Sequence, residues 1–317
     1  MDRMRAIIVR RFGGPEVLIV EEVDRPVPVP TEVLVAIHAA GVNPVDRSTR
    51  EGRGVASVVG EPPFIPGWDV SGVVAATGYG VTRFTEGDEV FGLIRFPHAG
   101  GAYAQYAAAP SRHLARKPSA LTHVQAAAVP LAALTAWQAL VETAQIEAGQ
   151  TVLIHAAAGG VGHLAVQIAR AYGARVIGTA RAEKQGFVRE LGADEVVDYT
   201  AGRFEDSVRD ADVVFDLVGD DYSYRSLDVL RPGGLLISAA SFIEPELPAL
   251  AARRGVRATG ILVEPDHAAL ERLGALIDDG RLRPVVEQVF PLEEAARAHV
   301  LGQRGRTQGK LVLRVVG

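Results

Sequence analysis

The sequence contains no cysteine, which excludes disulfide bonds and thiolate metal ligands. A strong charge of either sign is also missing. The formal net charge is −5, so neither nucleic acid nor an anionic membrane is an expected partner. No apolar stretch reaches membrane-spanning length without glycine, proline or charge, and the first five residues lead into a strand pattern rather than a signal peptide. We expect a soluble cytoplasmic protein, and 317 residues predict two domains.

The segment from Thr151 to Lys184 has the order strand, glycine-rich turn, helix, strand, which is typical of a dinucleotide-binding unit. Glycines in the turn let the backbone approach a pyrophosphate, and the helix N-terminus offers it N–H groups and a partial positive charge. Ala157 replaces the first glycine of the usual G-x-G-x-x-G spacing. The alternative is a tight turn without a ligand. The residues that we predict to bind the pyrophosphate are Ala158, Gly159, Gly160, Val161 and Gly162.

The pattern of predicted strands and helices divides the chain into two kinds of region. Short strands separated by glycine and proline predict an antiparallel β region, at 5–10, 17–23, 32–40, 70–76 and 88–93. An alanine-rich helical segment (125–144) follows. Strands that alternate with helices then predict an open parallel sheet covered on both faces, at 151–156, 175–180, 194–199, 213–218, 234–240 and 256–263.

After residue 265 the pattern predicts helices at 266–280 and 292–301 and strands at 285–290 and 311–316, which we expect to rejoin the N-terminal β region. The predicted fold class is α/β, with a discontinuous β-rich domain (1–122 and 264–317) and a Rossmann-type doubly wound domain (123–263).

The end of the second strand of the dinucleotide unit favours NADPH. NAD selection uses a carboxylate there to bind the ribose 2′-OH, but Thr179 and the residue after it carry none. Glu183 has the expected spacing, yet by register it falls on the first helical turn. Arg181 and Lys184 can clamp a 2′-phosphate. The alternative is a solvated helix start of mixed charge.

Several motifs in the right order resemble one family over nearly the whole chain. They are His155–Gly162 with Gln167, Gly41–Asp46, Ile65–Gly72, Leu191–Asp194 and Arg306–Lys310. Together they resemble the zinc-independent quinone oxidoreductase (ζ-crystallin-like) branch of the medium-chain dehydrogenase/reductases. The resemblance implies a GroES-like catalytic domain split around a Rossmann domain. It also implies NADPH-dependent hydride transfer to a quinone or an α,β-unsaturated carbonyl.

The resemblance assigns roles to residues outside the turn. It puts Asn43 and Asp46 at the nicotinamide end, where Asn43 can hydrogen-bond a carbonyl oxygen and Asp46 can hold the loop or a cofactor hydroxyl. The alternative for both is turn chemistry alone. The remaining cofactor residues that it implies are Thr135, Tyr199, Val218, Gly219, Ser238, Ala239, Gly309 and Lys310.

A zinc site is not expected. Zinc-containing relatives use cysteine and histidine ligands, but the 41–46 segment has no cysteine, and Trp68 stands where those relatives place a histidine. The eight histidines show no H-x-x-x-H pair, and His155 is interpreted as a packed structural residue. Without a Lewis acid, alcohol oxidation is disfavoured, and an electron-poor acceptor is favoured.

Two other functions stay open. Enoyl-thioester reductases of the same superfamily place a tyrosine about ten residues after the asparagine, and segment 50–54 has none, which argues against that branch. A non-catalytic NADPH-binding protein is the third possibility. Arg47, Arg50 and Arg53 can meet an anionic substrate or form a solvated surface loop. The apolar strand 256–263 can lie at a sheet edge, and its pairing with a second copy predicts a homodimer.

Overall fold

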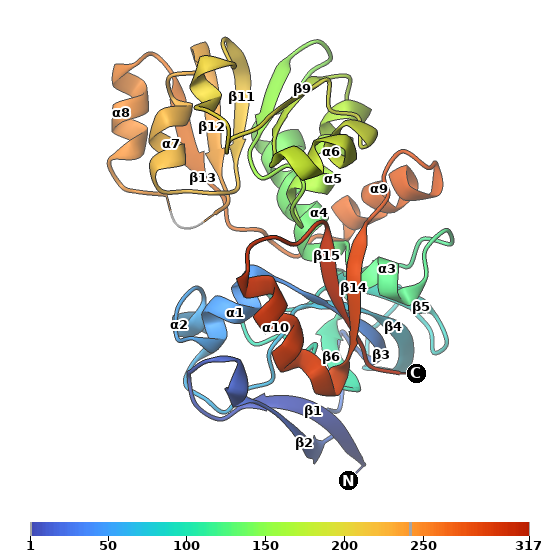
Figure 1. Cartoon of the computed structure of the whole chain (residues 1–317). Helices are drawn as coiled ribbons and strands as arrows, with labels where there is room; N and C mark the ends of the chain where they lie inside the picture. Colours follow the sequence, from blue (N-terminus) through green and yellow to red (C-terminus); the bar gives the residue numbers. More distant parts are fainter. Residues whose placement is uncertain (1, 241–242, 317) are drawn as a thin grey trace. The chain divides into compact units, whose positions relative to one another are not determined.

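The computed structural model describes residues 2–240 and 243–316, and the chain forms two compact units (Figure 1). The first comprises Met1–Leu134 and Glu264–Gly317, and the second comprises Thr135–Val263. The boundary between them falls at 134/135, whereas the sequence placed it at 122/123. Helix α3 (His123–Ala127) packs against β3 (Glu32–Val42) and β4 (Asp69–Thr77), which accounts for the difference.

The first unit contains a seven-stranded sheet in the order β14-β15-β3-β4-β5-β7, with β6 paired to β3, and a separate β1-β2 hairpin. Strand β15 pairs antiparallel with β3, so that Leu311 lies opposite Val42. The expectation that the C-terminal segment rejoins the N-terminal β region is confirmed. The other strands are β1 (Arg3–Val9), β2 (Leu18–Asp24), β5 (Glu89–Leu93), β6 (Tyr106–Pro110), β7 (Leu114–Arg116), β14 (Val286–Pro291) and β15 (Lys310–Arg314).

The helices of the first unit are short, and two of them, at 44–50 and 56–59, were not expected from the sequence. Helix α1 (Pro44–Arg50) begins directly after Asn43, with proline at its first position, where the missing N–H costs nothing. The sequence predicts a loop there. The others are α2 (Ala56–Val59), α3, α9 (His267–Asp278), α10 (Ala295–Gln303) and the first turns of α4 (Pro130–Trp137).

The second unit is a parallel sheet in the order β10-β9-β8-β11-β12-β13, as the sequence predicted. The strands are β8 (Thr151–Ile154), β9 (Arg175–Thr179), β10 (Glu195–Val197), β11 (Ala211–Asp216), β12 (Leu230–Ser238) and β13 (Arg257–Gly260). The chain order reverses between β8 and β11. In open parallel sheets, ligands bind beyond the carboxyl ends of the strands at such a switch point.

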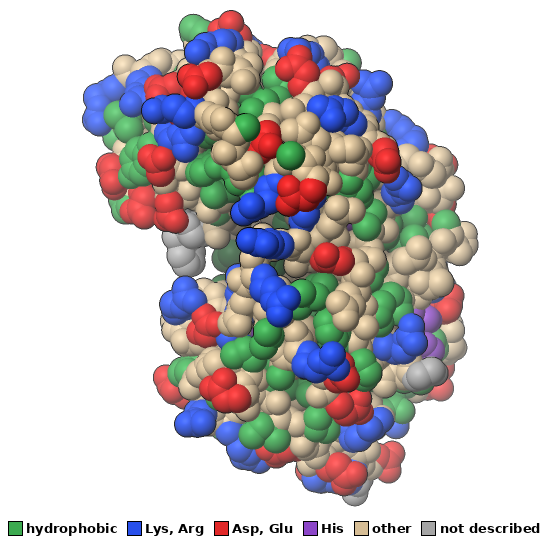
Figure 2. Space-filling view, viewed as in Figure 1, with side chains coloured by type: hydrophobic (Ala, Val, Ile, Leu, Met, Phe, Trp, Pro, Cys, Tyr) green, Lys and Arg blue, Asp and Glu red, His purple; other side chains and the backbone are tan. Residues whose placement is uncertain are grey.

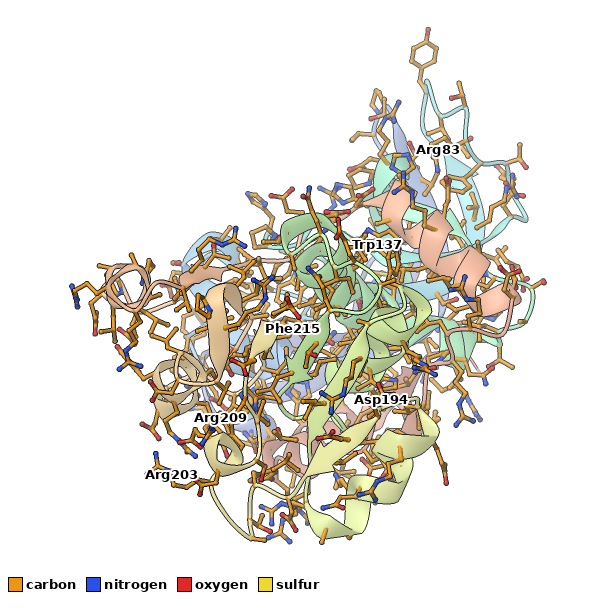
Figure 3. The ribbon with its side chains drawn as sticks, turned by 90° about the horizontal axis from the view of Figure 1, so that it is seen from above. Arg83, Trp137, Asp194, Arg203, Arg209 and Phe215 are labelled. Atoms are coloured by element: carbon orange, nitrogen blue, oxygen red, sulfur yellow. The ribbon has the colours of Figure 1, made fainter. Side chains whose placement is uncertain are left out.

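Helices flank this sheet. Helices α5 (Gly162–Ala171) and α6 (Gln185–Glu190) accompany β9 and β10, and α7 (Asp221–Ser226) and α8 (Leu247–Arg253) accompany β12 and β13 (Figure 1). Phe215 of β11 lies inside the unit, whereas Arg203 and Arg209 lie at its outer edge (Figure 3). The alanine-rich segment forms α4 and then a π-helix at Gln138–Thr143, which was not anticipated. Among the described helices, none is long and apolar enough to cross a bilayer.

Strand β13 lies at the edge of the parallel sheet, in the position the sequence suggested. It is shorter than predicted, since Arg257–Gly260 is the paired part. Leu262, just beyond it, is exposed.

Candidate functional site

The turn between β8 and α5 presents bare main chain at the switch point. Within the described part of the chain, the amides of Ala158, Gly160, Val161 and Gly162 donate to no other group of the protein. The amide of His163 is the first of the helix to find a carbonyl, that of Gly159 at 3.0 Å. Unpaired N–H groups at a helix N-terminus form an anion site. This is the arrangement that the sequence predicted for a pyrophosphate.

Two glycines make this turn possible by close packing. A Cβ atom on Gly162 would lie 2.3 Å from the Ala156 carbonyl oxygen, so no larger residue fits there. A Cβ on Gly178 of β9 would lie 2.9 Å from the Ala157 methyl group. Ala157 therefore replaces the usual glycine because Gly178, opposite it, has no side chain.

His155 directly follows β8, next to the switch point, and is fully buried. Its Nδ1 lies 3.2 Å from the Thr179 hydroxyl and its Nε2 lies 3.0 Å from the Ser226 hydroxyl. The ring packs edge-on against Phe204 and Tyr222. Burial lowers the pKa of His155 to about 4, so the ring is neutral near pH 7. The interpretation of His155 as a packed structural residue is confirmed.

The structure brings together two of the residues predicted on the adenosine side. The Arg181 guanidinium lies 5.7 Å from the centre of the Tyr199 ring. Thr179 is buried, and its hydroxyl accepts the Ala156 amide at 3.2 Å. Glu183 lies in the first turn after β9 rather than at the strand end, as its register predicted, and Lys184 ends that turn.

Asp216, at the end of β11, is a site-forming residue that the sequence reasoning missed. Its buried carboxylate accepts the amides of Val218 at 2.9 Å and Gly219 at 3.0 Å. It also accepts the Ser223 hydroxyl. The Ala239 amide, after β12, donates to the Asp216 carbonyl at 3.0 Å. Asp216 thus fixes the strand-end segments that were predicted to line the cofactor. The signal in the sequence was an aspartate at a strand end, three residues before Gly219.

In the first unit, Asp46 anchors the start of α1. Its Oδ2 accepts a hydrogen bond from the backbone amide of Asn43 at 2.6 Å and one from the Tyr103 hydroxyl at 2.9 Å. The Tyr103 oxygen in turn lies 3.2 Å from His299 Nε2. Burial raises the pKa of Asp46 to about 7. Asp46 therefore holds the segment in place, and no sequence signal identified Tyr103 or His299 as its partners.

The side chain of Asn43 is engaged on both of its polar atoms. Its Nδ2 donates to Asp69 Oδ2 at 2.8 Å, and its Oδ1 accepts the ammonium of Lys310. Lys310 Nζ lies 3.4 Å from the same Asp69 oxygen. Turn chemistry alone does not describe Asn43, because both polar atoms of its side chain contact residues that are distant in the sequence.

Glycines in the two N-terminal motifs provide the space for this cluster. A Cβ on Gly41 would lie 2.4 Å from the Ala127 carbonyl oxygen and 2.7 Å from Asp69 Oδ2. Gly67 has φ +91°, and a Cβ there would lie 2.3 Å from the Tyr103 ring. The absence of side chains at these positions lets Asp69 and Tyr103 reach Asn43 and Asp46.

Of two other predicted residues, Gly309 lies in the first unit and Thr135 in the second. Gly309 has φ +73°, and a Cβ there would lie 2.3 Å from the Val285 carbonyl oxygen. It therefore sets the entry to β15, which begins at Lys310. Thr135 is buried on α4. Roles of these residues toward a cofactor stay predictions.

The surface-loop interpretation is wrong for Arg50. Arg50 is 0 % exposed, lies on α1 and pairs with Glu51. Burial lowers the pKa of its guanidinium. Arg53 is exposed and pairs with the same glutamate. Arg47 and Arg50 lie on the helix, because the chain after Asn43 is helical up to Arg50, whereas Arg53 lies in the exposed turn that follows it.

Trp68 is a packed aromatic residue. Its indole N–H donates to the His98 carbonyl at 2.6 Å, and its ring meets Phe96 edge-on. Among residues 2–240 and 243–316, no group of three or more His, Asp or Glu is arranged to hold a metal ion. On the visible surface, Lys and Arg are interspersed with Asp and Glu (Figure 2).

Comparison with known proteins identifies the family. A family model described as "Alcohol dehydrogenase GroES-like domain" matches residues 29–119, and one described as "Zinc-binding dehydrogenase" matches residues 191–313. The chain is 37 % identical to the quinone oxidoreductase of Sus scrofa, with 98 % of this chain and 97 % of that protein aligned. The chain belongs to the quinone oxidoreductases of the medium-chain dehydrogenase/reductase superfamily.

Solved structures agree with this assignment. The quinone oxidoreductase of Coxiella burnetii has a TM-score of 0.95 and 36 % identity, covering 99 % of this chain and 100 % of that one. The Escherichia coli quinone oxidoreductase, solved in complex with NADPH, has a TM-score of 0.89 and 30 % identity, covering 98 % and 100 %. The predicted fold class and family resemblance are both confirmed.

Proposed function

We propose that this protein is an NADPH-dependent oxidoreductase that transfers hydride to a quinone or an α,β-unsaturated carbonyl. The observation that carries the proposal is the set of amides at the switch point of the parallel sheet, those of Ala158, Gly160, Val161 and Gly162, that have no partner in the described part of the chain. The Gly159 amide between them donates to the Ala156 carbonyl at 2.9 Å. Membership of the quinone oxidoreductase family supports the reaction class, and the NADPH complex of the Escherichia coli relative supports the cofactor.

The residues present fit NADPH. The amides of the turn suit the pyrophosphate, and Arg181 and Lys184 suit the 2′-phosphate, where a guanidinium provides a planar fork and an ammonium a point charge. The absence of a carboxylate at Thr179 removes the group that would favour NADH. Bound NADPH supplies the hydride.

In the first unit, we propose that Asn43 receives the carbonyl oxygen of the acceptor. The acceptor gains two electrons and one proton as hydride, which leaves negative charge on that oxygen. A proton from water completes the hydroquinone or the saturated ketone. The remaining N–H of Asn43 donates to the charged oxygen. Asp46 holds the backbone of Asn43 and contributes to positioning.

We also propose that the reaction is independent of zinc. The supporting observations are the lack of cysteine and the packed tryptophan at position 68. The description "Zinc-binding dehydrogenase" belongs to the wider family. A metal analysis of the purified protein that found stoichiometric zinc, together with loss of activity in a chelator, would contradict this proposal.

We further propose a cytoplasmic homodimer that pairs through the 256–263 edge strand. The edge position of β13 and the exposed Leu262 support it, because an unpaired apolar edge favours association. Light scattering is expected to give twice the chain mass. A monomeric mass at micromolar concentration would refute the dimer.

The proposed function is tested by NADPH consumption with 1,4-benzoquinone, a conjugated ketone, an enoyl thioester and no acceptor. We expect one NADPH to be consumed for each benzoquinone reduced, and weaker activity with NADH. Faster turnover of the enoyl thioester would favour the biosynthetic alternative, which the absence of tyrosine in 50–54 disfavours. Tight NADPH binding without turnover of any acceptor would identify a non-catalytic binding protein.

A further inference from the structure

Three charged or polar side chains meet almost out of contact with solvent in the first unit. Asn43 is 4 % exposed, Lys310 is 3 % exposed and Asp69 is 0 % exposed. Each contacts the other two through the interactions described above. A buried lysine is uncommon, since burying an ammonium costs free energy unless it is paired and hydrogen-bonded. This one is paired with a carboxylate and bound to an amide oxygen.

The chemistry of these partners settles which way the Asn43 amide points. An ammonium can only donate hydrogen bonds, and an ionised carboxylate can only accept them. The atom that faces Lys310 must therefore be the amide oxygen, and the atom that faces Asp69 must be the amide nitrogen. A flipped amide would place a donor against Lys310 and an acceptor against Asp69.

Asp69 is itself fixed, so it cannot follow a rotating amide. Its second oxygen, Oδ1, accepts the Leu131 amide at 2.7 Å, in the first turn of α4. Gly41, which has no side chain, lies next to the other oxygen of Asp69, Oδ2. Lys310 is fixed by the turn at Gly309, and its backbone amide donates to the Val285 carbonyl at 2.9 Å. Both neighbours of Asn43 are thus held from outside the cluster.

We propose that Lys310 and Asp69 are positioning residues, which lock Asn43 so that it offers an N–H to the carbonyl oxygen of the acceptor. The inference rests on the proposed function and names the device that orients its donor. One N–H of Asn43 is used by Asp69, and the second remains for a ligand. Lys310 polarises the amide from its oxygen side, which makes the remaining N–H a stronger donor.

The device defines which acceptors gain most from it. Hydride arrival places negative charge on the carbonyl oxygen, and a preorganised donor stabilises that charge. Electron-rich quinones and enones accept hydride reluctantly and depend on this stabilisation. Electron-poor quinones depend on it less. Loss of the lock should therefore reduce activity most for the weakest acceptors.

The chain offers a matched control. It has three lysines, at 117, 184 and 310. Lys117 is also poorly exposed and lies in the same unit, where it pairs with Glu89 and donates to the Leu121 carbonyl. Lys117→Met removes a buried ammonium without touching Asn43. Lys310→Met removes the one that holds it.

The experiment measures kcat/KM for a series of substituted 1,4-benzoquinones and enones of decreasing hydride affinity. For Lys310→Met and Asp69→Asn we expect losses of ~10-fold to 100-fold for weak acceptors and much smaller losses for strong ones. The NADPH dissociation constant should change less than about twofold. Lys117→Met should lower kcat/KM by the same factor for every acceptor, or leave it unchanged. Equal losses across the series for Lys310→Met would overturn the proposal.

A charge-conserving exchange keeps the test valid if single variants fold poorly. Asn43→Asp combined with Asp69→Asn retains one amide, one carboxylate and the ammonium, but removes the donor at position 43. We expect a melting temperature close to that of wild type and a loss of activity with the weak acceptors. Full activity with weak acceptors in this double variant would overturn the proposal.

A readout without turnover separates this inference from the proposed function. 4-Nitrophenol, bound in the presence of NADP⁺, reports the donors around its oxygen through the absorbance of its phenolate. Wild type should lower the pKa of the bound phenol, and the double variant should not. An identical pKa in both would contradict the locked donor. If no acceptor is reduced but the pKa of the bound phenol is lowered, the proposed reaction is wrong and the locked donor at Asn43 is supported.

Discussion

The turn between β8 and α5 and the cluster around Asn43 are built in opposite ways. The turn offers main-chain amides where side chains are missing, and Gly162 and Gly178 provide the space. The cluster buries an ammonium and a carboxylate that hold the Asn43 side chain, and a second carboxyl group that holds the Asn43 backbone. The turn depends on local backbone geometry. The cluster depends on residues from β3, α1, β4 and β15, so its parts are separated by more than two hundred residues.

The largest expected effect breaks the turn. In Gly162→Val the new Cβ would meet the Ala156 carbonyl at 2.3 Å, and the amides would no longer converge on a phosphate. We expect NADPH affinity to fall on the order of 100-fold or more, since charge-assisted hydrogen bonds are lost. Isothermal titration measures the change. Gly186→Ala, in α6 with open space around it, should bind normally, and wild-type affinity in Gly162→Val would contradict the site.

A slightly smaller effect is expected from the side chains beside the turn. Arg181→Ala with Lys184→Ala should weaken NADPH binding ~10-fold to 100-fold and leave NADH binding unchanged. The ratio of the two dissociation constants is the measurement. Arg170→Ala with Arg189→Ala removes two exposed cations of the same unit as a control. An unchanged ratio in the first pair would leave the 2′-phosphate without a partner.

The corresponding substitution in the cluster is Gly41→Ala. Its Cβ would press on Asp69 and on the Ala127 carbonyl, displacing Asp69 from Asn43. We expect kcat to fall ~10-fold, because small displacements at a reacting centre are costly, while NADPH affinity stays the same. Steady-state kinetics and titration test the split, with Gly274→Ala in α9 as control. A loss of NADPH affinity alone would show that the two sites are not separable in this way.

Asp46 predicts a pH dependence of stability. Its pKa rises from 3.8 to about 7 on folding, mainly through burial. The protonated carboxyl therefore stabilises the fold, fully below its unfolded pKa, and this contribution is lost as the pH rises through about 7. Asp46→Asn should reduce the decline of the unfolding free energy over this window. Urea titrations between pH 4 and 8 measure it, with exposed Asp279→Asn as control. Parallel curves for wild type and Asp46→Asn would disprove it.

His155 predicts the opposite slope in the other unit. Its folded pKa is lowered from 6.5 to about 4 by burial, so its contribution is complete above 6.5 and is lost as the pH falls through about 4. The unfolding free energy of His155→Gln should decline less on acidification than that of wild type. Denaturant titrations from pH 7 to 4 provide the comparison. A steeper acid decline in the variant would contradict a neutral, buried ring.

The turn could be predicted from the sequence because its signal is contiguous. Strand, small residues and helix follow within one segment, and the spacing indicates the ligand chemistry. Glu183 could be placed on the helical turn from its register alone. Asp216 was missed because an aspartate at a strand end looks like any turn residue until its three donors are seen.

The cluster could not be predicted in the same way. Asn43 and Asp46 were selected by resemblance, but their partners lie far along the chain and have no shared spacing. The helix after Asn43 was read as a loop, although an Asn-Pro start with an acid in the first turn favours a helix. That error also made Arg50 a surface residue.

The sequence by itself determined the two kinds of domain, the glycine turn and the absence of thiolate chemistry, since these depend on composition and on neighbours along the chain. Only the tertiary structure decided that Lys310 and Asp69 hold Asn43 and that Tyr103 supports Asp46. Such contacts arise when distant strands pair and close glycines allow side chains to approach. Their free energy depends on burial and on partners, which no local pattern records.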